Sequence, residues 1–360
     1  MAVFREKTDL HYNYQIDLIN KNSGIVVIKK ITKEVFKMAQ PAYLKYRLLN
    51  LPSTNVVQKV YVGATYVYAL QLINSNTNVV ISRIPKTNVT STYDLDFSSG
   101  EQMYLNNFGH GQTWEYFSHN GEDYWWVVTK PNGGSENWGT QLARVQYSPN
   151  TQTDTPYNGN TSVTRLALLN HATLDGSSYG TLERVEGALS SDRATLLIAG
   201  LDTNGTSHFT LYDNEALNNA MDKVDANHGY VRLDEATSML STGVTTPYYS
   251  IANFRSVLTS SSVQGYDLSN GYAVYVSSGQ AASDDHPNQD TPGVTKFAWG
   301  HTTGTQVELR NTNWADQNVE TEGIQIGSSD LYIGISYHDL PYATKTLENR
   351  IYTADKSFWD

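Results

Sequence analysis

Residues 262–279 read Ser262-Val-Gln-Gly-Tyr-Asp-Leu-Ser-Asn-Gly-Tyr-Ala-Val-Tyr-Val-Ser-Ser-Gly279, a pattern that predicts two β-strands joined by a tight turn. The residues from 263 to 268 alternate in character, and Ser269-Asn270-Gly271 suits a turn because Asn and Gly tolerate positive φ. Residues 272–276 are rich in aromatic and β-branched side chains, as expected of a buried strand. A third strand is expected at residues 294–300.

The same pattern occurs five times in the chain: a Gln or Glu with an apolar residue nearby, a polar turn and an apolar strand. The five Gln or Glu positions are Gln58, Gln112, Glu186, Gln264 and Glu322. Each copy is followed by a further strand, expected at residues 78–84, 141–147, 207–212, 294–300 and 348–352. Five such units predict an all-β fold, a five-bladed β-propeller whose loops vary in length. A double sandwich or two separate β domains are the alternatives.

The propeller is expected to occupy residues 43–360 as a single domain. A strand at residues 43–49 could pair with one at 349–353 and close the ring, which would remove an exposed sheet edge. Residues 1–42 read as an N-terminal extension packed on the propeller, with a strand at 25–28, a short helix at 31–38 and a break at Pro41.

One short helix between blades is predicted at residues 214–224. Asp213 or Asn214 can cap it, and an apolar face recurs at helical spacing. That face consists of Leu217, Ala220, Met221 and Val224.

The composition fits an all-β chain and argues against several functions. The 360 residues include 25 Tyr, 7 Trp and 26 Gly. Since cysteine is absent, the chain has no disulfide and no thiolate chemistry. A formal net charge of −11 disfavours nucleic acid and anionic membranes as partners, and no apolar run is long enough to span a bilayer. We therefore expect no nucleic-acid binding and no membrane insertion.

Aromatic residues are concentrated in the second repeat. Trp125 and Trp126 are adjacent in a predicted strand, so they should point to opposite faces and pack between blades on both sides. Exposed tryptophans with polar neighbours would instead suit stacking on sugar rings. The candidates for sugar binding are Trp114, Trp125, Trp126 and Trp138.

The five Gln and Glu residues should converge near the central channel if they begin the innermost strands. They could hydrogen-bond neighbouring blades and hold the ring in register, or line a channel filled with water or a cation. A third possibility is that Glu186 and Glu322 act as an acid/base pair on a glycosidic bond. Because Gln cannot serve as acid or base, the mixture of Gln and Glu favours a structural or cation-binding role.

Other chemical motifs are few. The chain has no glycine-rich phosphate loop, no His-Glu-x-x-His helix and no Gly-x-Ser-x-Gly elbow. A polar loop with Asp284, Asp285 and Asp290 could bind calcium, although the EF-hand spacing is missing. A divalent cation such as calcium is thus the one cofactor considered, and a solvated loop is the alternative.

Several segments resemble, in order, those of helveticin-J-like proteins, which are large, heat-labile class III bacteriocins of lactobacilli. The resemblance covers the chain from about residue 43 to the end. It rests on Tyr66-Val-Tyr-Ala-Leu-Gln-Leu72, Gln112-Thr-Trp-Glu-Tyr116, Ala143-Arg-Val-Gln-Tyr147, His208-Phe-Thr-Leu-Tyr212, Val263-Gln-Gly-Tyr-Asp-Leu268 and Glu322-Gly-Ile-Gln-Ile326.

The resemblance implies a secreted or surface-associated antibacterial protein that acts on related Gram-positive bacteria, and it supplies no catalytic residues. The expected partner is a cell-wall glycan or another envelope receptor. A glycan-active hydrolase using channel carboxylates and a cell-surface glycan-binding or interaction propeller are the alternatives. The segment Met1-Ala-Val-Phe-Arg-Glu-Lys-Thr-Asp9 lacks the apolar region of a signal peptide, so the export route is open.

Overall fold

The computed structural model describes residues 38–154, 163–225 and 229–360. The chain divides into two units, Met1–Phe36 and Lys37–Asp360, and the described residues all belong to the second. The strand predicted at 25–28, the helix predicted from residue 31 and the packing of the extension lie outside the described residues. Residues 38–41, which we assigned to the extension, form strand β1 of the propeller.

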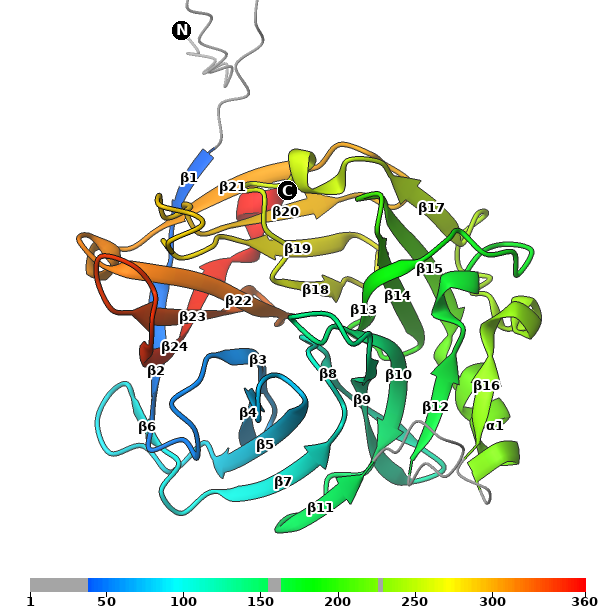
Figure 1. Ribbon diagram of the computed structural model, residues 1–360, viewed down its shortest axis with the longest axis horizontal. Helices are drawn as coiled ribbons and strands as arrows, with labels where there is room; N and C mark the ends of the chain where they lie inside the picture. The colour runs from blue at the N-terminus through cyan, green and yellow to red at the C-terminus, as the bar shows by residue number, and fades with distance from the viewer. Residues whose placement is uncertain (1–37, 155–162, 226–228) are drawn as a thin grey trace, which may run out of the picture. The chain divides into compact units, whose positions relative to one another are not determined.

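Five β-sheets, called blades 1 to 5 in chain order, form the framework (Figure 1). Blade 1 comprises β3 (Val57–Val62), β4 (Tyr66–Ile73), β5 (Asn78–Pro85), β7 (Glu101–Asn106) and β11 (Thr151–Asp154). Blade 2 comprises β8 (Trp114–His119), β9 (Glu122–Pro131), β10 (Gly139–Val145), β12 (Thr164–Ala167) and β16 (Tyr230–Arg232). Blade 3 comprises β13 (Leu182–Leu189), β14 (Thr195–Asp202), β15 (Ser207–Asp213) and β17 (Tyr248–Ile251).

Blade 4 comprises β18 (Gly265–Leu268), β19 (Val274–Ser278), β20 (Gly293–Phe297), β21 (Thr305–Arg310) and β1 (Met38–Pro41). Blade 5 comprises β22 (Asn318–Ile326), β23 (Asp330–His338), β24 (Thr346–Asp355), β2 (Tyr43–Leu49) and β6 (Asp94–Asp96). In every blade the first four strands are given in their spatial order, and each is antiparallel to the next.

The first strands of the five blades form a closed inner ring. Strand β3 contacts β8 and β22, β13 contacts β8 and β18, and β18 contacts β22. Close approach in this ring needs a glycine on β22, because a Cβ on Gly323 would lie 2.6 Å from the carbonyl oxygen of Gln58. The arrangement confirms the predicted five-bladed propeller.

The outer edges of four blades are covered by a parallel strand from the next blade. Strands β6, β11 and β16 each come from the connection between the third and fourth strands of one blade and pair with the blade before it. Strand β1 precedes β2 of blade 5 and pairs in the same way with β21 of blade 4. These strands tie neighbouring blades together and cover edges that could otherwise pair with another chain.

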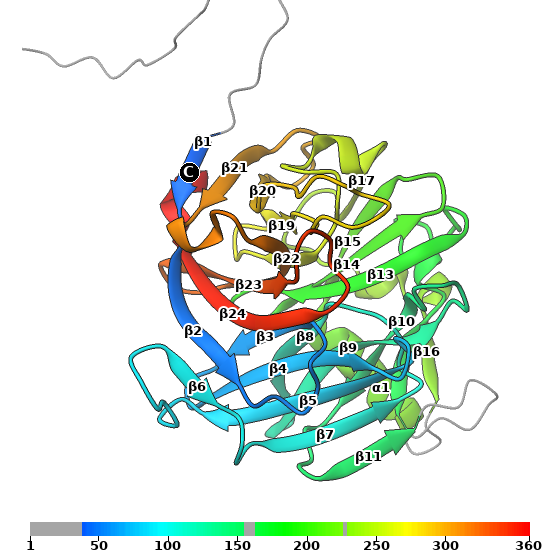
Figure 2. The ribbon, with the colours of Figure 1, turned by 60° about the vertical axis from the view of Figure 1, so that its left-hand side comes forward.

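Ring closure joins the two ends of the described chain in blade 5. Strand β2 lies antiparallel to β24, with Tyr43 opposite Thr353 and Leu48 opposite Asn349 (Figure 2). This is the pairing predicted from the sequence. Closure of the ring therefore rests on backbone hydrogen bonds between residues about 300 positions apart.

The predicted helix forms as α1 (Asn214–Asp225), between β15 and β16. The Asp213 carboxylate caps it by accepting a 2.9 Å hydrogen bond from the backbone N–H of Ala216. Leu217 and Met221 are fully buried. Short 3₁₀ helices among the described residues are η1 (Leu169–His171), η2 (Leu233–Glu235), η3 (Thr237–Met239), η4 (Phe254–Val257), η5 (Thr312–Trp314) and η6 (Lys356–Trp359).

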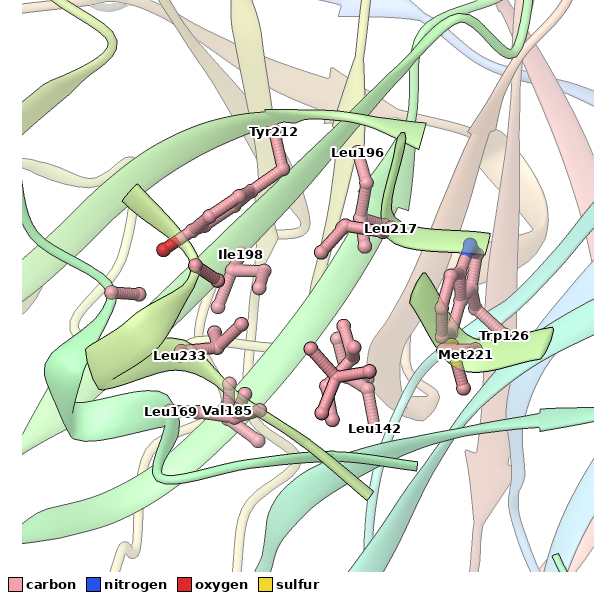
Figure 3. Packing of buried hydrophobic residues seen from close by; sticks show 14 of the residues in the cluster. Trp126, Leu142, Leu169, Val185, Leu196, Ile198, Tyr212, Leu217, Met221 and Leu233 are labelled. Atoms are coloured by element: carbon pink, nitrogen blue, oxygen red, sulfur yellow. The ribbon is translucent and has the colours of Figure 1, made fainter. Parts of the chain in front are cut away.

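The hydrophobic core consists of five clusters, each between two consecutive blades. Strand alternation places Leu196 in the cluster between blades 2 and 3, shown in Figure 3, and Leu197 in the cluster between blades 3 and 4. Trp125 and Trp126 divide in the same way, between blades 1 and 2 and between blades 2 and 3, as expected. Each blade is thus buried on both faces, and its inner strand is left facing the ring.

Candidate functional site

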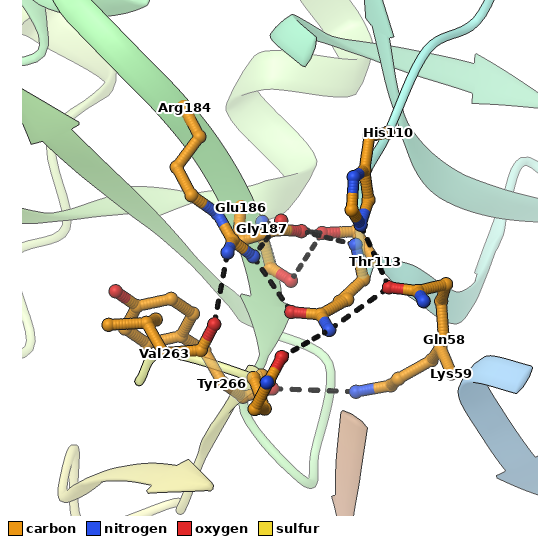
Figure 4. Close-up of polar contacts among 12 residues, drawn as sticks. Gln58, Lys59, His110, Thr113, Arg184, Glu186, Gly187, Val263 and Tyr266 are labelled. Atoms are coloured by element: carbon orange, nitrogen blue, oxygen red, sulfur yellow. Dashed lines mark hydrogen bonds and ion pairs between the residues drawn. The ribbon is translucent and has the colours of Figure 1, made fainter. Parts of the chain in front are cut away.

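The structure brings the five predicted Gln and Glu side chains together at the inner ring. Figure 4 labels two of them, Gln58 and Glu186. The Nε2 of Gln112 lies 3.1 Å from Oε1 of Gln58, 3.2 Å from Oε1 of Gln264 and 3.0 Å from Oε2 of Glu322. The backbone N–H of Gln112 donates to Oε2 of Glu186 at 2.9 Å. One residue of blade 2 therefore contacts the matching position of every other blade. We call these five residues, with Arg184, the inner-ring network.

Arg184 fixes the orientation of the amides in this network. Its guanidinium donates to Oε1 of Gln112 at 2.7 Å, and since Arg has only donors, Gln112 must direct its NH₂ group at Gln58. Gln58 then presents its oxygen, which also lies 2.9 Å from Nε2 of His110. Burial, together with the charge of Arg184, lowers the pKa of His110 to about 3, so the imidazole is neutral and donates through Nε2–H.

The carboxylate of Glu186 is fully engaged by hydrogen-bond donors. Arg184, two residues earlier on β13, donates to Oε1 at 2.7 Å. The hydroxyl of Thr113 donates to Oε2 at 2.7 Å, beside the backbone N–H of Gln112. Glu186 is 1% exposed, and its hydrogen bonds with Gln112 and Thr113 join blade 3 to blade 2.

Glu322 is also 1% exposed but lacks a cation at hydrogen-bond distance among the described residues. Burial raises the pKa of Glu322 well above its usual value, and the charge of Glu320, two residues earlier on the same face of β22, adds to this rise. A carboxyl that keeps its proton can occupy the same hydrogen-bonding place as the Gln residues of the other blades.

The network reaches solvent at Gln264 and Glu320, which we call the Gln264–Glu320 pair. Nε2 of Gln264 donates to Oε1 of Glu320 at 3.1 Å, and both residues are half-buried. The other oxygen of Glu320 lies 3.2 Å from Nε2 of His338, which is buried. An amide and a carboxylate thus lie side by side, partly exposed to solvent.

A second buried cluster lies on the same inner strands and consists of Lys59, Glu115 and Asp267. Nζ of Lys59 lies 2.7 Å from Oε1 of Glu115 and donates to the carbonyl of Ile324 at 2.6 Å. Burial raises the pKa of Glu115 to about 7, against the effect of Lys59. Burial raises the pKa of Asp267 as well, again opposed by Lys59. Burial alone would lower the pKa of Lys59. The Glu115 and Asp267 carboxylates have the larger combined effect, so the pKa of Lys59 is raised.

The four tryptophans considered as candidates for sugar binding present no free ring face. Trp114, Trp125 and Trp126 are at most 3% exposed and belong to the core clusters. Trp138 stacks on His110 with 3.6 Å between ring centroids, and the guanidinium carbon of Arg184 lies 3.7 Å from its ring. Two groups cannot share one ring face at these distances, so both faces of Trp138 are occupied. Packing, the alternative interpretation, accounts for all four positions.

The loop proposed for calcium does not gather its carboxylates. Asp290 pairs with His286 at 3.3 Å and accepts from the backbone N–H of Gln280. In the described parts of the chain, no three His, Asp or Glu side chains are grouped so that they could hold a metal ion. Neither is any helix in these parts long and apolar enough to cross a membrane.

Several residues of the site were missed at the sequence level, and the reasons differ. Arg184 and Glu320 each lie two positions before a predicted site residue, so strand alternation alone would have placed them on the same face. Lys59 follows Gln58 directly and was hidden by a β-bulge, in which Val57 pairs with Gln71 and Lys59 with Leu70. His110 is in a loop, and no sequence signal pointed to it.

These features define a five-bladed propeller whose inner strands carry a buried polar network open to solvent at one pair of residues. The sequence model of the family described as bacteriocin helveticin-J matches residues 32–357. Bacteriocin helveticin-J of Lactobacillus helveticus is 30% identical over 321 residues, which cover 82% of this chain and 91% of that protein. The chain belongs to the helveticin-J family.

Solved structures with similar folds are distant. A thermostable family-43 glycoside hydrolase is 10% identical, with a TM-score of 0.42 and coverage of 88% of this chain and 91% of that one. The α-L-arabinofuranosidase PaAbf62A from Podospora anserina is 11% identical, with a TM-score of 0.43 and coverage of 88% and 98%. Likenesses of this size do not bear on the chemistry of the site.

Proposed function

We propose that this protein is a bacteriocin-like antibacterial protein that recognises the envelope of related Gram-positive bacteria through a glycan. Membership of the helveticin-J family supports the antibacterial part. The Gln264–Glu320 pair supports the glycan part and is the observation that carries it. In this role the protein acts outside the producing cell or at a cell surface.

The chemistry of the pair suits hydroxyl groups. An amide offers a donor and an acceptor, and a carboxylate offers acceptors, so together they can bind neighbouring hydroxyls of a sugar ring. Gln264 accepts a hydrogen bond from Gln112, and Glu320 accepts one from Gln264, so each group has a fixed partner. Such preorganisation lowers the entropy cost of binding a flexible glycan.

The proposal is tested with labelled protein on intact lactobacilli and on purified walls. A Gln264→Ala/Glu320→Ala variant should lose about tenfold or more in affinity, because it removes both groups. A matched control is Gln146→Ala/Glu122→Ala, since Gln146 donates to Glu122 at 3.2 Å on the exposed surface. The control should bind like the unchanged protein.

Treatment of the walls identifies the receptor class. Periodate, which cleaves vicinal diols, should abolish binding, whereas protease treatment of the walls should not. Binding that survives periodate and is lost with protease would point to a protein receptor and contradict the proposal. Dye-loaded vesicles made of lipid alone should stay intact when the protein is added, because we propose no membrane insertion.

A glycan hydrolase that uses Glu186 and Glu322 is the alternative. The raised pKa of Glu322 resembles that of a general acid, but Glu186 is fully hydrogen-bonded and both residues are 1% exposed. We therefore propose that neither residue is catalytic. Incubation of purified walls with the protein should release no reducing sugar above that of a heat-treated sample.

A further inference from the structure

Blade 5 carries a cavity of about 450 Å³ that no step of the account above uses. It is bounded by β2, β23, β24 and the connection around η5, and none of its lining residues belongs to the inner-ring network. A volume of several hundred Å³ is large enough for one or two sugar units. Six of its seven lining residues carry a guanidinium, amide or phenol group, so a polar ligand is expected.

Two arginines lie side by side in the lining of this cavity. Arg47 on β2 lies directly opposite Arg350 on β24, and these strands are adjacent in Figure 2. Like charges at opposite positions of a sheet are unfavourable unless an anion lies close. Asp94 pairs with Arg47 and Glu348 with Arg350, at 2.5 Å and 2.7 Å. Neither carboxylate lines the cavity, so the guanidinium groups form its charged wall.

The arginines are held in place but not fully occupied. Arg47 uses Nε and Nη2 on Asp94, and no partner of its Nη1 appears among the contacts of the described residues. Arg350 uses Nε and Nη2 on Glu348, and it donates from Nη1 to the hydroxyl of Tyr337 at 3.0 Å. Because a guanidinium has five N–H donors, Arg47 can bind an anion without releasing its carboxylate.

The remaining wall supplies a ring face and amides. Tyr93 is 46% exposed, and Asn313 and Gln317 are exposed in the connection that precedes β22. We propose that this cavity binds an acidic sugar unit, one that carries a carboxylate or a phosphodiester. Arg47 and Arg350 take the acid group, Tyr93 packs on the ring or polyol carbons, and the amides bind hydroxyls.

Calorimetry with three soluble probes tests the proposal on the full chain. The probes are a glucuronate-containing tetrasaccharide, a glycerol-phosphate oligomer and neutral chitotetraose. At least one acidic probe should bind about tenfold or more tightly than chitotetraose, and binding should weaken as salt is added. Which acidic probe binds decides between carboxylate and phosphodiester.

Variants assign the binding to the cavity. Arg47→Gln should weaken binding of the acidic probe about tenfold. Arg255→Gln is the matched control, because the side chains of Arg255 and Arg47 are 40% and 41% exposed and each pairs with a carboxylate. The control should leave binding unchanged, and thermal unfolding checks that each variant folds. Tyr93→Ala removes an exposed side chain and provides a second test if Arg47→Gln does not fold.

The proposal is wrong if neither acidic probe binds, if chitotetraose binds as tightly, or if Arg255→Gln weakens binding as much as Arg47→Gln. Gln264→Ala/Glu320→Ala should leave these affinities unchanged. A negative result at the cavity therefore does not contradict the proposed function of the Gln264–Glu320 pair. Equally, a negative result at that pair does not contradict the proposal for the cavity.

Discussion

The inner-ring network and the Lys59 cluster both bury charge between the inner strands, but they neutralise it differently. In the network, one cation meets one fully bonded carboxylate, Arg184 with Glu186, and amides occupy most of the other positions. In the cluster, Lys59 faces two buried carboxylates, Glu115 and Asp267, whose pKa values are both raised. The network is therefore held mainly by matched donors and acceptors, with a raised pKa at Glu322 alone, whereas both carboxyls of the cluster have raised pKa values and its balance depends on their protons.

The largest expected effect is in the cluster. Lys59→Met leaves Glu115 and Asp267 without their cation and should cost about 3–5 kcal/mol in the free energy of unfolding near pH 8. Near pH 5 the loss should be smaller, because both carboxyls can then be protonated. Urea unfolding at the two pH values measures the difference. Lys296→Met, which breaks the partly exposed pair with Asp360, is the control and should cost less than about 1 kcal/mol. An equal loss at both pH values for Lys59→Met would contradict the proton-dependent balance.

A somewhat smaller effect is expected in the network. Arg184→Met removes the cation from Glu186, but the Gln112 N–H and the Thr113 hydroxyl remain, so the cost should be about 3 kcal/mol. In a Glu186→Gln background the same change should cost less, because no buried charge is left unpaired. Strictly additive losses in this double-mutant cycle would show that the two residues are not coupled.

The sequence predicted the inner strands of the ring better than it predicted the partners of the buried charged residues. The repeated Gln or Glu located all five inner strands, and strand alternation sorted Trp125 and Trp126 to opposite faces. It did not reveal the partners, because Lys59 enters the ring through a bulge and His110 through a loop. The cavity of blade 5 was also not predicted, because the sequence indicated that β2 pairs with β24 but not the register that places Arg47 opposite Arg350.

A pH-dependent effect on stability is expected at Glu322. Because its folded-state pKa is raised, the folded protein holds a proton that the unfolded chain releases above about pH 4.5. The free energy of unfolding therefore falls as pH rises from there toward the folded pKa. Glu322→Gln removes this loss, so it should raise the unfolding temperature near pH 8 relative to the unchanged protein and change it little near pH 4. A stabilisation that is the same at both pH values would contradict the raised pKa.

The central claim, that the carboxylates of the inner ring hold the blades together and perform no chemistry, is tested most directly by a killing assay. Glu186→Gln and Glu322→Gln are made separately, and each folded variant is assayed for binding to target cells and for killing them. Since Gln already fills the matching place in three blades, both variants should bind and kill within about twofold of the unchanged protein. A folded variant that still binds target cells but no longer kills them would show that its carboxylate does chemistry, and the hydrolase alternative would replace this account.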